Sequence, residues 1–537
     1  MLISTLFITF SSVFLISLTL IELCSLGYPI QEKLTHSKSD KLCLSDETAW
    51  VPNGVAICTA EDIQNEIRIC SDGFGGAIIV WHEWRNKYVT STDIYAQKIN
   101  STGHIQWTLN GTPVCTATHH QTLPALCTDG EGGAIIVYED ARHGGIVNLY
   151  AQRINVSGNG HWTTNGMPIC IQDRWQTFAE ICSDGNGGAI MTWRDGRNIL
   201  TTDMDIYAQR VNSTGNIQWT FNGIPITTEN KPQVFPKICS DESGGAIITW
   251  DDHRDSELTS TDIYAQKVDI NGIEKWTLNG TAITTEIEIQ NDPKICNDGL
   301  GGAIITWKDN RSGIDYDIYA QRIDFNGSIM WTPNGTAIST ANNDQTLQQI
   351  CSDGAGGAII TWHDYRNGNW DIYAQRIDSN GNIMWTPNGK SICTRSDNQV
   401  NPEICSDETG GAIITWCDER NLGSTGLDIY AQRVDSNGAI QYNTNGMAIC
   451  TADNVQRYAE ICSAGNGDAF IVWQDQRSDP NGDLYAQITN YVPSDGPSDG
   501  IPGISFGNYY ILYITVAILS LIIIKKSQIH SKSDYST

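Results

Sequence analysis

The chain alternates short apolar runs with turn-forming residues from about residue 67 to residue 491. Residues 358–362 are apolar at every position, which indicates a strand covered on both faces. Residues 371–378 mix polar and apolar positions, and Asp-Gly and Asn-Gly pairs between such segments supply the positive φ angles of tight hairpins. No stretch inside this region keeps a helical period. The pattern therefore predicts an all-β region.

This region contains eight copies of one repeat, and successive copies lie 54 to 57 residues apart. Gly-Gly-Ala triplets mark seven copies, and Asp468 replaces the second Gly in the eighth. The triplets end at Ala77, Ala134, Ala189, Ala246, Ala303, Ala358, Ala412 and Ala469. Each repeat is long enough for four short strands with their turns. Such units cannot bury both sheet faces alone, so they must pack on one another in a ring or an open array.

The two ends of the repeat region favour the ring. The last copy stops after its DLYAQ segment and lacks the WTxNG element that follows this segment elsewhere. An unpaired element of this type precedes the first copy, at Trp50, Pro52, Asn53 and Gly54. We therefore predict an eight-bladed β-propeller of four-stranded blades over residues 49–491, with residues 49–58 forming the outer strand of the final blade and removing an open edge.

Apolar segments flank the repeats on both sides. Residues 2–21 are uncharged and apolar, so residues 1–27 are predicted to be a signal peptide or signal anchor, followed by a leader at 28–48. A Pro-, Ser-, Asp- and Gly-rich linker is predicted at 492–508, and a transmembrane helix at 509–524. Lys525 and Lys526 follow at once, which favours a cytoplasmic tail at 525–537 and a propeller outside the membrane. The predicted location is the cell surface.

The chain carries 33 Lys and Arg against 61 Asp and Glu, a formal charge of −28. A charge of this sign repels nucleic acid, so nucleic-acid partners are excluded.

The recurring segments GGAIITWxDxR and DIYAQRID resemble those of secreted multi-blade propeller proteins of bacteria and archaea, which are loosely similar to Asp-box sialidase-like propellers. The C-terminus resembles an archaeal surface-sorting signal, in which a Pro-Gly-Phe motif precedes an apolar helix and a basic end. Here Pro502 and Gly503 match that motif, and Ile504 stands in the place of Phe. The resemblance implies a propeller held at a cell surface, and it implies no single activity.

Every copy carries an acid and an Arg two residues apart, such as Asp364 and Arg366. These residues could act as paired carboxylates for glycoside hydrolysis or as an arginine cluster for a substrate carboxylate. Because all eight copies share them, we expect a charge-assisted pair that ties each hairpin together. The SDGxGG turns, such as 352–357, could hold Ca²⁺, but tight-turn geometry explains their Asp and Gly without metal, and no cofactor is predicted.

A Cys precedes the SDG-type turn in every copy, and five of these cysteines have a companion twelve residues earlier. In an exported protein this spacing predicts disulfides, with buried free thiols as the alternative. The candidate pairs are Cys58 and Cys70, Cys115 and Cys127, Cys170 and Cys182, Cys393 and Cys405, and Cys450 and Cys462.

Eight Asn-x-Ser/Thr triplets are candidate glycosylation sites, at Asn100, Asn110, Asn155, Asn212, Asn279, Asn310, Asn326 and Asn334. Seven of them avoid the face expected to carry the connections between repeats and the loops that vary in length. Variable loops on a rigid scaffold are where binding usually resides. Candidate ligand-contacting residues on these loops are His119, His120, Arg174, Trp175, Lys231, Tyr316 and Trp370.

Three functional hypotheses follow. The first is a cell-surface recognition or adhesion module that binds an extracellular glycan or protein. The second is a sialidase-like glycan hydrolase, which requires acids that break the repeat, and the sequence offers no Arg triad with a Tyr nucleophile for it. The third is a structural component of the envelope. Since propellers host enzymes, binders and scaffolds, the fold does not choose among them, and no catalytic residue is predicted.

Overall fold

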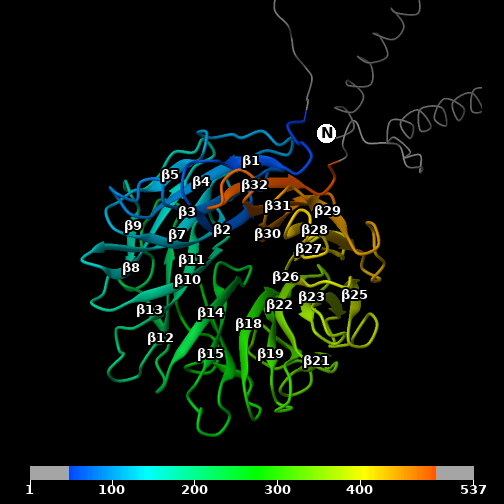
Figure 1. Cartoon of the computed structure of the whole chain (residues 1–537). Helices are drawn as coiled ribbons and strands as arrows, with labels where there is room; N and C mark the ends of the chain where they lie inside the picture. Colours follow the sequence, from blue (N-terminus) through cyan, green and yellow to red (C-terminus); the bar gives the residue numbers. More distant parts are fainter. Residues whose placement is uncertain (1–47, 492–537) are drawn as a thin grey trace, which may run out of the picture. The chain divides into compact units, whose positions relative to one another are not determined.

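The computed structural model describes residues 48–491, which form one compact unit. The predicted signal segment, leader, linker, transmembrane helix and tail lie outside the described residues. Residues 48–491 contain no helix that is long and apolar enough to cross a membrane. They fold into eight four-stranded antiparallel sheets, which confirms the predicted all-β, eight-bladed propeller. Figure 1 shows the blades following one another around a common centre.

The strands of each blade are called A to D from the centre outward. Blades 1 and 2 comprise β2 (Gln64–Ser71), β3 (Ala77–Glu83), β4 (Asp93–Ile99), β5 (Thr112–Cys115), β6 (Gln121–Thr128), β7 (Ala134–His143), β8 (Ile146–Ile154) and β9 (Met167–Cys170). Blades 3 and 4 comprise β10 (Gln176–Ser183), β11 (Ala189–Asp195), β12 (Asp205–Val211), β13 (Ile224–Thr227), β14 (Gln233–Ser240), β15 (Ala246–Asp252), β16 (Asp262–Val268) and β17 (Thr281–Thr284).

The remaining blades repeat this order. Blades 5 and 6 comprise β18 (Gln290–Asn297), β19 (Ala303–Asp309), β20 (Asp317–Ile323), β21 (Thr336–Ser339), β22 (Gln345–Ser352), β23 (Ala358–Asp364), β24 (Asp371–Ile377) and β25 (Lys390–Cys393). Blades 7 and 8 comprise β26 (Gln399–Ser406), β27 (Ala412–Asp418), β28 (Asp428–Val434), β29 (Met447–Cys450), β30 (Gln456–Gly465), β31 (Asp468–Asp475), β32 (Asp483–Ile488) and, from the N-terminal end, β1 (Val55–Cys58).

The ring closes as the unpaired N-terminal element predicts. Strand β1 pairs antiparallel with β32, and the two lie side by side in Figure 1. Arg477 of blade 8 donates to the carbonyl of Asn53 over 2.7 Å, the same bond that the equivalent arginines make to their own outer strands. Strand A of blade 8 in turn packs against strand A of blade 1. Each blade therefore has two neighbours, and none is left at an end.

The direction of the strands defines two faces. The D–A connections and the B–C loops lie at one end of the blades, which we call the mouth face, and the A–B and C–D turns lie at the other, the turn face. Both ends of the described chain lie on the turn face. Ala49 donates its backbone N–H to Thr102 in a C–D turn, and Thr489 donates to Ala469 at the start of a B strand.

The acid and Arg of each B strand tie a blade together, as predicted. In blade 7, Asp418 accepts hydrogen bonds from the indole of Trp416 at 2.8 Å and from the Nη2 of Arg420 at 2.6 Å. The guanidinium lies 3.8 Å over the ring of Tyr430 on strand C and also donates to the carbonyl of Asn445 on the outer strand. The pair thus joins strands B, C and D, and it leaves no free carboxylate for catalysis.

The Asp of the SDG-type turn, present in seven of the eight blades, is also occupied by protein groups. Asp353 Oδ1 accepts two backbone N–H groups at 2.8 Å, and its Oδ2 lies 2.8 Å from the guanidinium of Arg376. Arg376 also donates to the carbonyl of Ser436 in the next blade. The turn therefore links neighbouring blades through a cation of the chain itself.

The predicted disulfides are not formed, because the structure keeps all fourteen described cysteines as free thiols. Cys58 lies beside Arg85, at the level of Gln64, where strand A of blade 1 begins. Cys70 lies six residues further along that strand, which is about 20 Å at roughly 3.3 Å per residue. A disulfide needs Cα atoms within about 7 Å, so this spacing cannot form one. The same geometry separates the other four pairs, and the cysteines pack as small buried or partly buried side chains.

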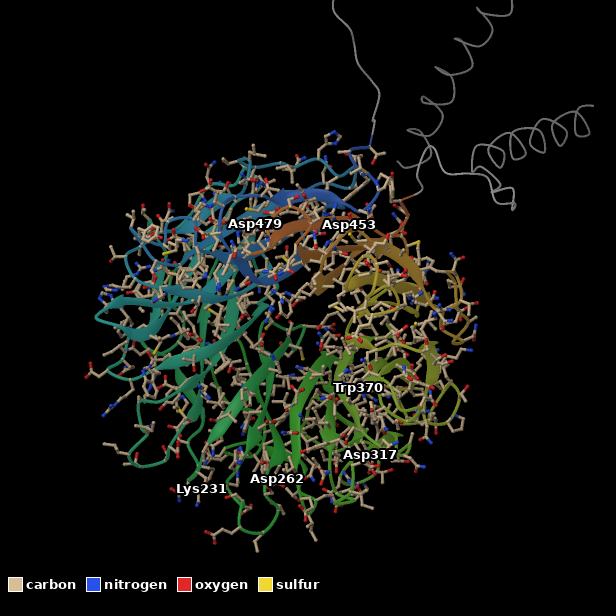
Figure 2. The ribbon with its side chains drawn as sticks, in the orientation of Figure 1. Lys231, Asp262, Asp317, Trp370, Asp453 and Asp479 are labelled. Atoms are coloured by element: carbon tan, nitrogen blue, oxygen red, sulfur yellow. The ribbon has the colours of Figure 1, made fainter. Side chains whose placement is uncertain are left out.

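In seven blades the first residue of strand C is an Asp, and burial raises the pKa of its carboxyl. Burial raises the pKa of Asp262 to about 6, and burial together with Asp315 raises that of Asp317 to about 7 (labelled in Figure 2). Blade 2 has Asn148 in this place. Because the folded chain holds these protons more tightly, their contribution to stability is complete below the unfolded pKa of about 4 and is lost as the pH rises toward 7.

We predict that Asp317→Asn, which copies blade 2, stabilises the propeller more at pH 8 than at pH 5. The amide removes the cost of ionising a buried carboxyl, and we expect a gain of about 1 kcal/mol in the free energy of unfolding at pH 8. Thermal melts of both proteins at the two pH values measure this. A loss of stability at pH 8, or an equal gain at both, contradicts the assigned pKa shift.

Candidate functional site

The innermost strand of every blade carries a β-bulge near the mouth face. In blade 1 the register with strand B shifts between Asn65 and Arg68, and the residue in the bulge, Glu66, has a φ of 51°. Positive φ is uncommon for residues other than Gly, yet it recurs in all eight blades. The bulge residues are Glu66, Leu123, Phe178, Phe235, Asp292, Leu347, Asn401 and Tyr458. These residues form a ring at the mouth, in which Leu123, Phe178 and Phe235 are apolar neighbours and the other five alternate in chemistry.

A second ring lies two residues further along the same strands. Its members are Arg68, Ala125, Glu180, Lys237, Lys294, Gln349, Glu403 and Glu460. Seven of these side chains are polar, and the seven line one cavity in the channel. Both positions vary from blade to blade, whereas the Ile-Cys-Ser-Asp sequence that follows them on strand A is nearly constant. We call the two rings together the axial mouth.

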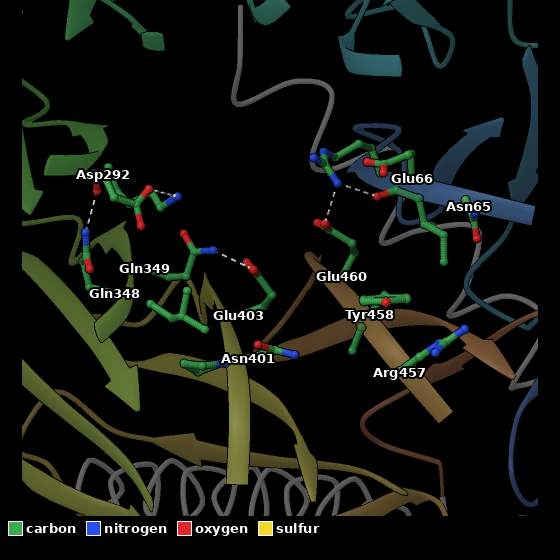
Figure 3. A pocket seen from close by; sticks show the side chains of 16 residues that line it. Asn65, Glu66, Asp292, Gln348, Gln349, Asn401, Glu403, Arg457, Tyr458 and Glu460 are labelled. Carbon is green, nitrogen blue, oxygen red and sulfur yellow. Dashed lines mark hydrogen bonds and ion pairs between the residues drawn. The ribbon is translucent and has the colours of Figure 1, made fainter. Parts of the chain in front are cut away.

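The axial mouth has two compartments. The larger has a volume of about 480 Å³ and is lined by Leu347, Gln349, Asn401, Glu403, Tyr458 and Glu460 among others (Figure 3). The smaller, of about 330 Å³, is lined by Leu123, Phe178, Glu180, Phe235 and Lys237 among others. Both are also lined by Glu66, Arg68, Asp292 and Lys294, so they are two halves of one opening.

The cations of the wall are paired with carboxylates of the same site. Arg68 lies 2.9 Å from Glu460 of the adjacent blade, and Lys294 lies 3.0 Å from Asp292 on its own strand. Lys237 pairs with Glu180. At the mouth, Arg457 donates to Gln474 at 2.8 Å and lies 4.9 Å over the ring of Tyr458. These contacts fix the long side chains and balance the positive charge of the wall.

Glu403 differs from the other carboxylates, because its hydrogen-bond partner is a neutral amide. Gln349 donates to it over 2.6 Å, as Figure 3 shows. Burial in the channel, together with the neighbouring charge of Glu460, raises the pKa of Glu403 to about 8. Burial also raises the pKa of Glu460, although Arg68 opposes this. Glu403 therefore carries a proton at neutral pH while Glu460 is held against a guanidinium.

A third variable position supports the bulges from beneath. This position lies on strand B, between the aromatic residue (Trp, or Tyr138 in blade 2) and the acid. From blade 1 to blade 8 it is occupied by His82, Glu139, Arg194, Asp251, Lys308, His363, Cys417 and Gln474. Glu139 accepts the backbone N–H of Phe178 at 2.9 Å, and Asp251 accepts that of Asp292 at 3.0 Å. Burial raises the pKa of Glu139 to about 7. These side chains hold the bulge of the next blade in place.

The loop residues predicted as ligand contacts lie on the mouth face but outside the axial mouth. Trp370 stacks on His363 at 4.0 Å, and the carbonyl of Lys231 accepts a bond from Gln233. Figure 2 places Lys231 at the outer edge of the ring. His120 packs against Trp84, and Tyr316 lies beneath Lys308. None of the seven predicted residues lines either compartment described above.

Trp175 is the most prominent of the predicted loop aromatics, since it is 54 % exposed. It remains a candidate contact for a ligand that reaches beyond the mouth. The glycosylation candidates are also placed by the fold, with Asn100, Asn155, Asn212 and Asn326 at C–D turns on the opposite face. Within residues 48–491 no cluster of three or more metal-ligating side chains occurs.

The axial mouth could have been found in the sequence. Its residues occupy fixed places before each invariant Cys, and alignment of the eight copies shows that these places vary between copies. The search for repeat-breaking residues in the loops missed them, because the mouth is built from bulges inside strands.

No protein-family model and no curated protein matches the chain. Among solved structures, it is similar to a protein of unknown function from Dyadobacter fermentans, with 9 % identity, coverage of 82 % of this chain and 98 % of the other, and a TM-score of 0.36. It is similar to a polysaccharide lyase, an ulvan lyase bound to a GlcA–Rha3S unit, with 10 % identity, coverage of 82 % and 94 %, and a TM-score of 0.41.

A third similar structure is the α-L-arabinofuranosidase of Fusarium graminearum, with 10 % identity, coverage of 68 % and 91 %, and a TM-score of 0.31. These similarities are weak, and the eight-bladed fold follows from the strand pairing alone.

Proposed function

We propose that this chain is a recognition module that binds a glycan in the axial mouth and presents the mouth outward from a cell surface. The observation that carries the proposal is the concentration of variable residues in the mouth. The innermost strands of the eight blades differ at the two positions whose side chains face the opening, whereas the Ile-Cys-Ser-Asp sequence that follows is nearly constant. A ring that served the fold alone would not need six different residue types at its eight bulges.

The chemistry of the mouth suits a ligand rich in hydroxyl groups. Amides at Asn65, Gln349 and Asn401 donate and accept hydrogen bonds, and carboxylates at Glu66 and Glu403 lie among them. A sugar hydroxyl also donates and accepts, so it can bond to either kind of group. Exposed aromatic rings beside these groups offer flat apolar surfaces to the C–H faces of a sugar. Ligand sites commonly combine such surfaces with a few placed polar groups.

The position of the chain ends supports the outward orientation. Both ends of the described residues lie on the turn face, opposite the mouth. A membrane anchor formed by residues 509–524 would therefore tether the turn face and leave the mouth pointing away from the membrane. The predicted linker at 492–508 would provide the spacing. This arrangement fits a partner in the extracellular space.

A glycan-array screen of the full-length protein tests the proposal. We expect Asn401→Ala/Tyr458→Ala to lose at least about tenfold in affinity for the best ligand, since both side chains face the larger compartment. The matched loop variant Arg174→Ala/Trp175→Ala should bind as the wild type does. If the loop variant loses binding and the mouth variant keeps it, the site lies on the loops instead. An array without any signal removes the glycan proposal.

A second candidate function is glycan hydrolysis, and Glu403 with Glu460 favours it. A carboxyl whose pKa is raised to about 8, beside one paired with a guanidinium, suits the division of roles that general acid catalysis of glycoside cleavage needs. Mass spectrometry of bound oligosaccharides tests this candidate. Shortened products that disappear in Glu403→Gln, while binding persists, would establish an enzyme. Intact ligands after long incubation would exclude hydrolysis of those ligands and leave recognition as the proposed function.

A further inference from the structure

Three of the eight bulge residues are aromatic, and all three are exposed. Phe178 and Phe235 occupy the bulges of blades 3 and 4, and Tyr458 occupies that of blade 8. Their exposed fractions are 40 %, 46 % and 56 %. Large apolar side chains are usually covered on a folded chain, so exposed rings at equivalent places on one opening indicate a binding surface.

The rings are held in place rather than free. The centroids of Phe178 and Phe235 lie 5.6 Å apart with an angle of 70° between their planes, which is the favoured edge-to-face arrangement. The guanidinium of Arg194 lies 4.6 Å over Phe178, and that of Arg457 lies 4.9 Å over Tyr458. Cations on one side of these two rings fix their planes and leave the remaining surface to a ligand. Such preorganisation lowers the entropy that binding costs.

The aromatic residues lie on opposite sides of the channel. In a closed ring of eight blades, three blades separate blade 4 from blade 8 in either direction. Between the two sides lie Glu66 and Arg68 of blade 1 and Asp292 and Lys294 of blade 5, which line both compartments. We call these four residues the polar floor. The opening therefore consists of an aromatic surface, the polar floor and a second aromatic surface, in that order.

The polar floor does not favour an anionic ligand. Among the lining residues that the structure describes, three of the four cations are paired with carboxylates, Arg68 with Glu460, Lys294 with Asp292 and Lys237 with Glu180. The fourth, Arg457, bonds to the neutral amide of Gln474. A polyanion that bound to the three paired cations would have to displace their carboxylates. The formal charge of −28 adds long-range repulsion. A neutral ligand meets neither cost.

We infer that the mouth binds an internal stretch of a neutral polysaccharide chain, which crosses the opening from Phe178 and Phe235 to Tyr458. This inference rests on the proposed function and specifies its ligand. Sugar rings pack on the aromatic surface at each side, and their hydroxyls bond to the polar floor between. A single sugar contacts one side only, because the two aromatic surfaces lie across the channel from each other. Affinity must therefore grow with chain length until both sides are occupied.

Calorimetric titration of the full-length protein with cello-, xylo- and manno-oligosaccharides of about two to eight units tests the inference. In the series that binds, affinity should rise by at least about tenfold with length and then level off. Phe235→Ala and Tyr458→Ala should each weaken the longest oligosaccharide by about tenfold. The shortest oligosaccharide that binds should lose affinity with only one of these two substitutions, because it contacts only one side of the opening.

Two variants serve as controls. Tyr458→Phe keeps the ring and should bind as the wild type does. Phe221→Ala removes an aromatic side chain that is 63 % exposed but lies in an outer-strand turn away from the mouth, and it should have no effect.

Several results would overturn the inference. These are an affinity that does not depend on length, a loss confined to one aromatic side for long chains, preferred binding of heparin, polygalacturonate or a peptide, and no binding in any of the three series. Array signals restricted to terminal or charged sugars would overturn it and leave the proposed function standing. An array without signals would remove both.

Discussion

Removal of residues 49–58 will open the ring and lower the melting temperature by roughly 10 °C. The deletion takes away β1, and with it the buried side chains of Trp50, Ile57 and Cys58. It also leaves Arg477 without the carbonyl of Asn53 and exposes the edge of β32 to other molecules. Differential scanning calorimetry of the full-length protein and the deletion variant measures the effect, and light scattering measures the aggregation that a free edge promotes.

The matched control is Ala56→Ser, which changes an exposed side chain on the same strand and should leave the melt unchanged. An unchanged melt of the deletion variant would mean that the eighth blade is stable with three strands, and that closure contributes little to the fold.

Asp418→Ala should lower the free energy of unfolding by about 3 to 5 kcal/mol. The carboxylate is fully buried and accepts bonds from Trp416, from the backbone N–H of Arg420 and from its guanidinium. The alanine variant leaves a half-buried guanidinium without its counter-charge and a buried indole N–H without an acceptor, which costs more than the pair itself contributes. Chemical denaturation monitored by tryptophan fluorescence measures the change.

Two further variants bracket that result. Asp418→Asn keeps an acceptor for the indole N–H, so its loss in the free energy of unfolding should be smaller than that of Asp418→Ala. Asp435→Ala, in a C–D turn where the carboxylate accepts backbone N–H groups from Asn437 and Ala439, should cost no more than about 1 kcal/mol. Equal losses for Asp418→Ala and Asp435→Ala would contradict the role assigned to the B-strand pair.

The sequence predicts the fold well, because the repeat occurs eight times and the same strand pattern can be recognised in each copy. The element at Trp50 to Gly54 even predicts how the ring closes, since it matches the one part that the last copy lacks. The prediction of disulfides was wrong for a geometric reason. A spacing of twelve residues from Cys58 to Cys70 suggests proximity, but the stretch includes most of an extended strand, which carries the two thiols apart.

The candidate site was harder to predict than the fold. A bulge at Glu66 or Tyr458 leaves no composition signal, because its positive φ is imposed by the strand pairing and not by a Gly. The raised pKa of Glu403 likewise depends on its burial in the channel and on the charge of Glu460, which comes from another blade. Such properties arise when the ring brings separate repeats together. Comparison of the copies with one another, position by position, is the sequence method that would have found them.

Hydrogen–deuterium exchange of the full-length protein, with and without the best glycan from the array, tests most directly that the axial mouth is the binding site. We predict that the ligand slows exchange at the bulges, in residues 65–68, 347–349, 401–403 and 457–460, and leaves the loops at 118–120, 173–175 and 311–316 unchanged. Slower exchange confined to those loops, or to the turn face, would contradict the account.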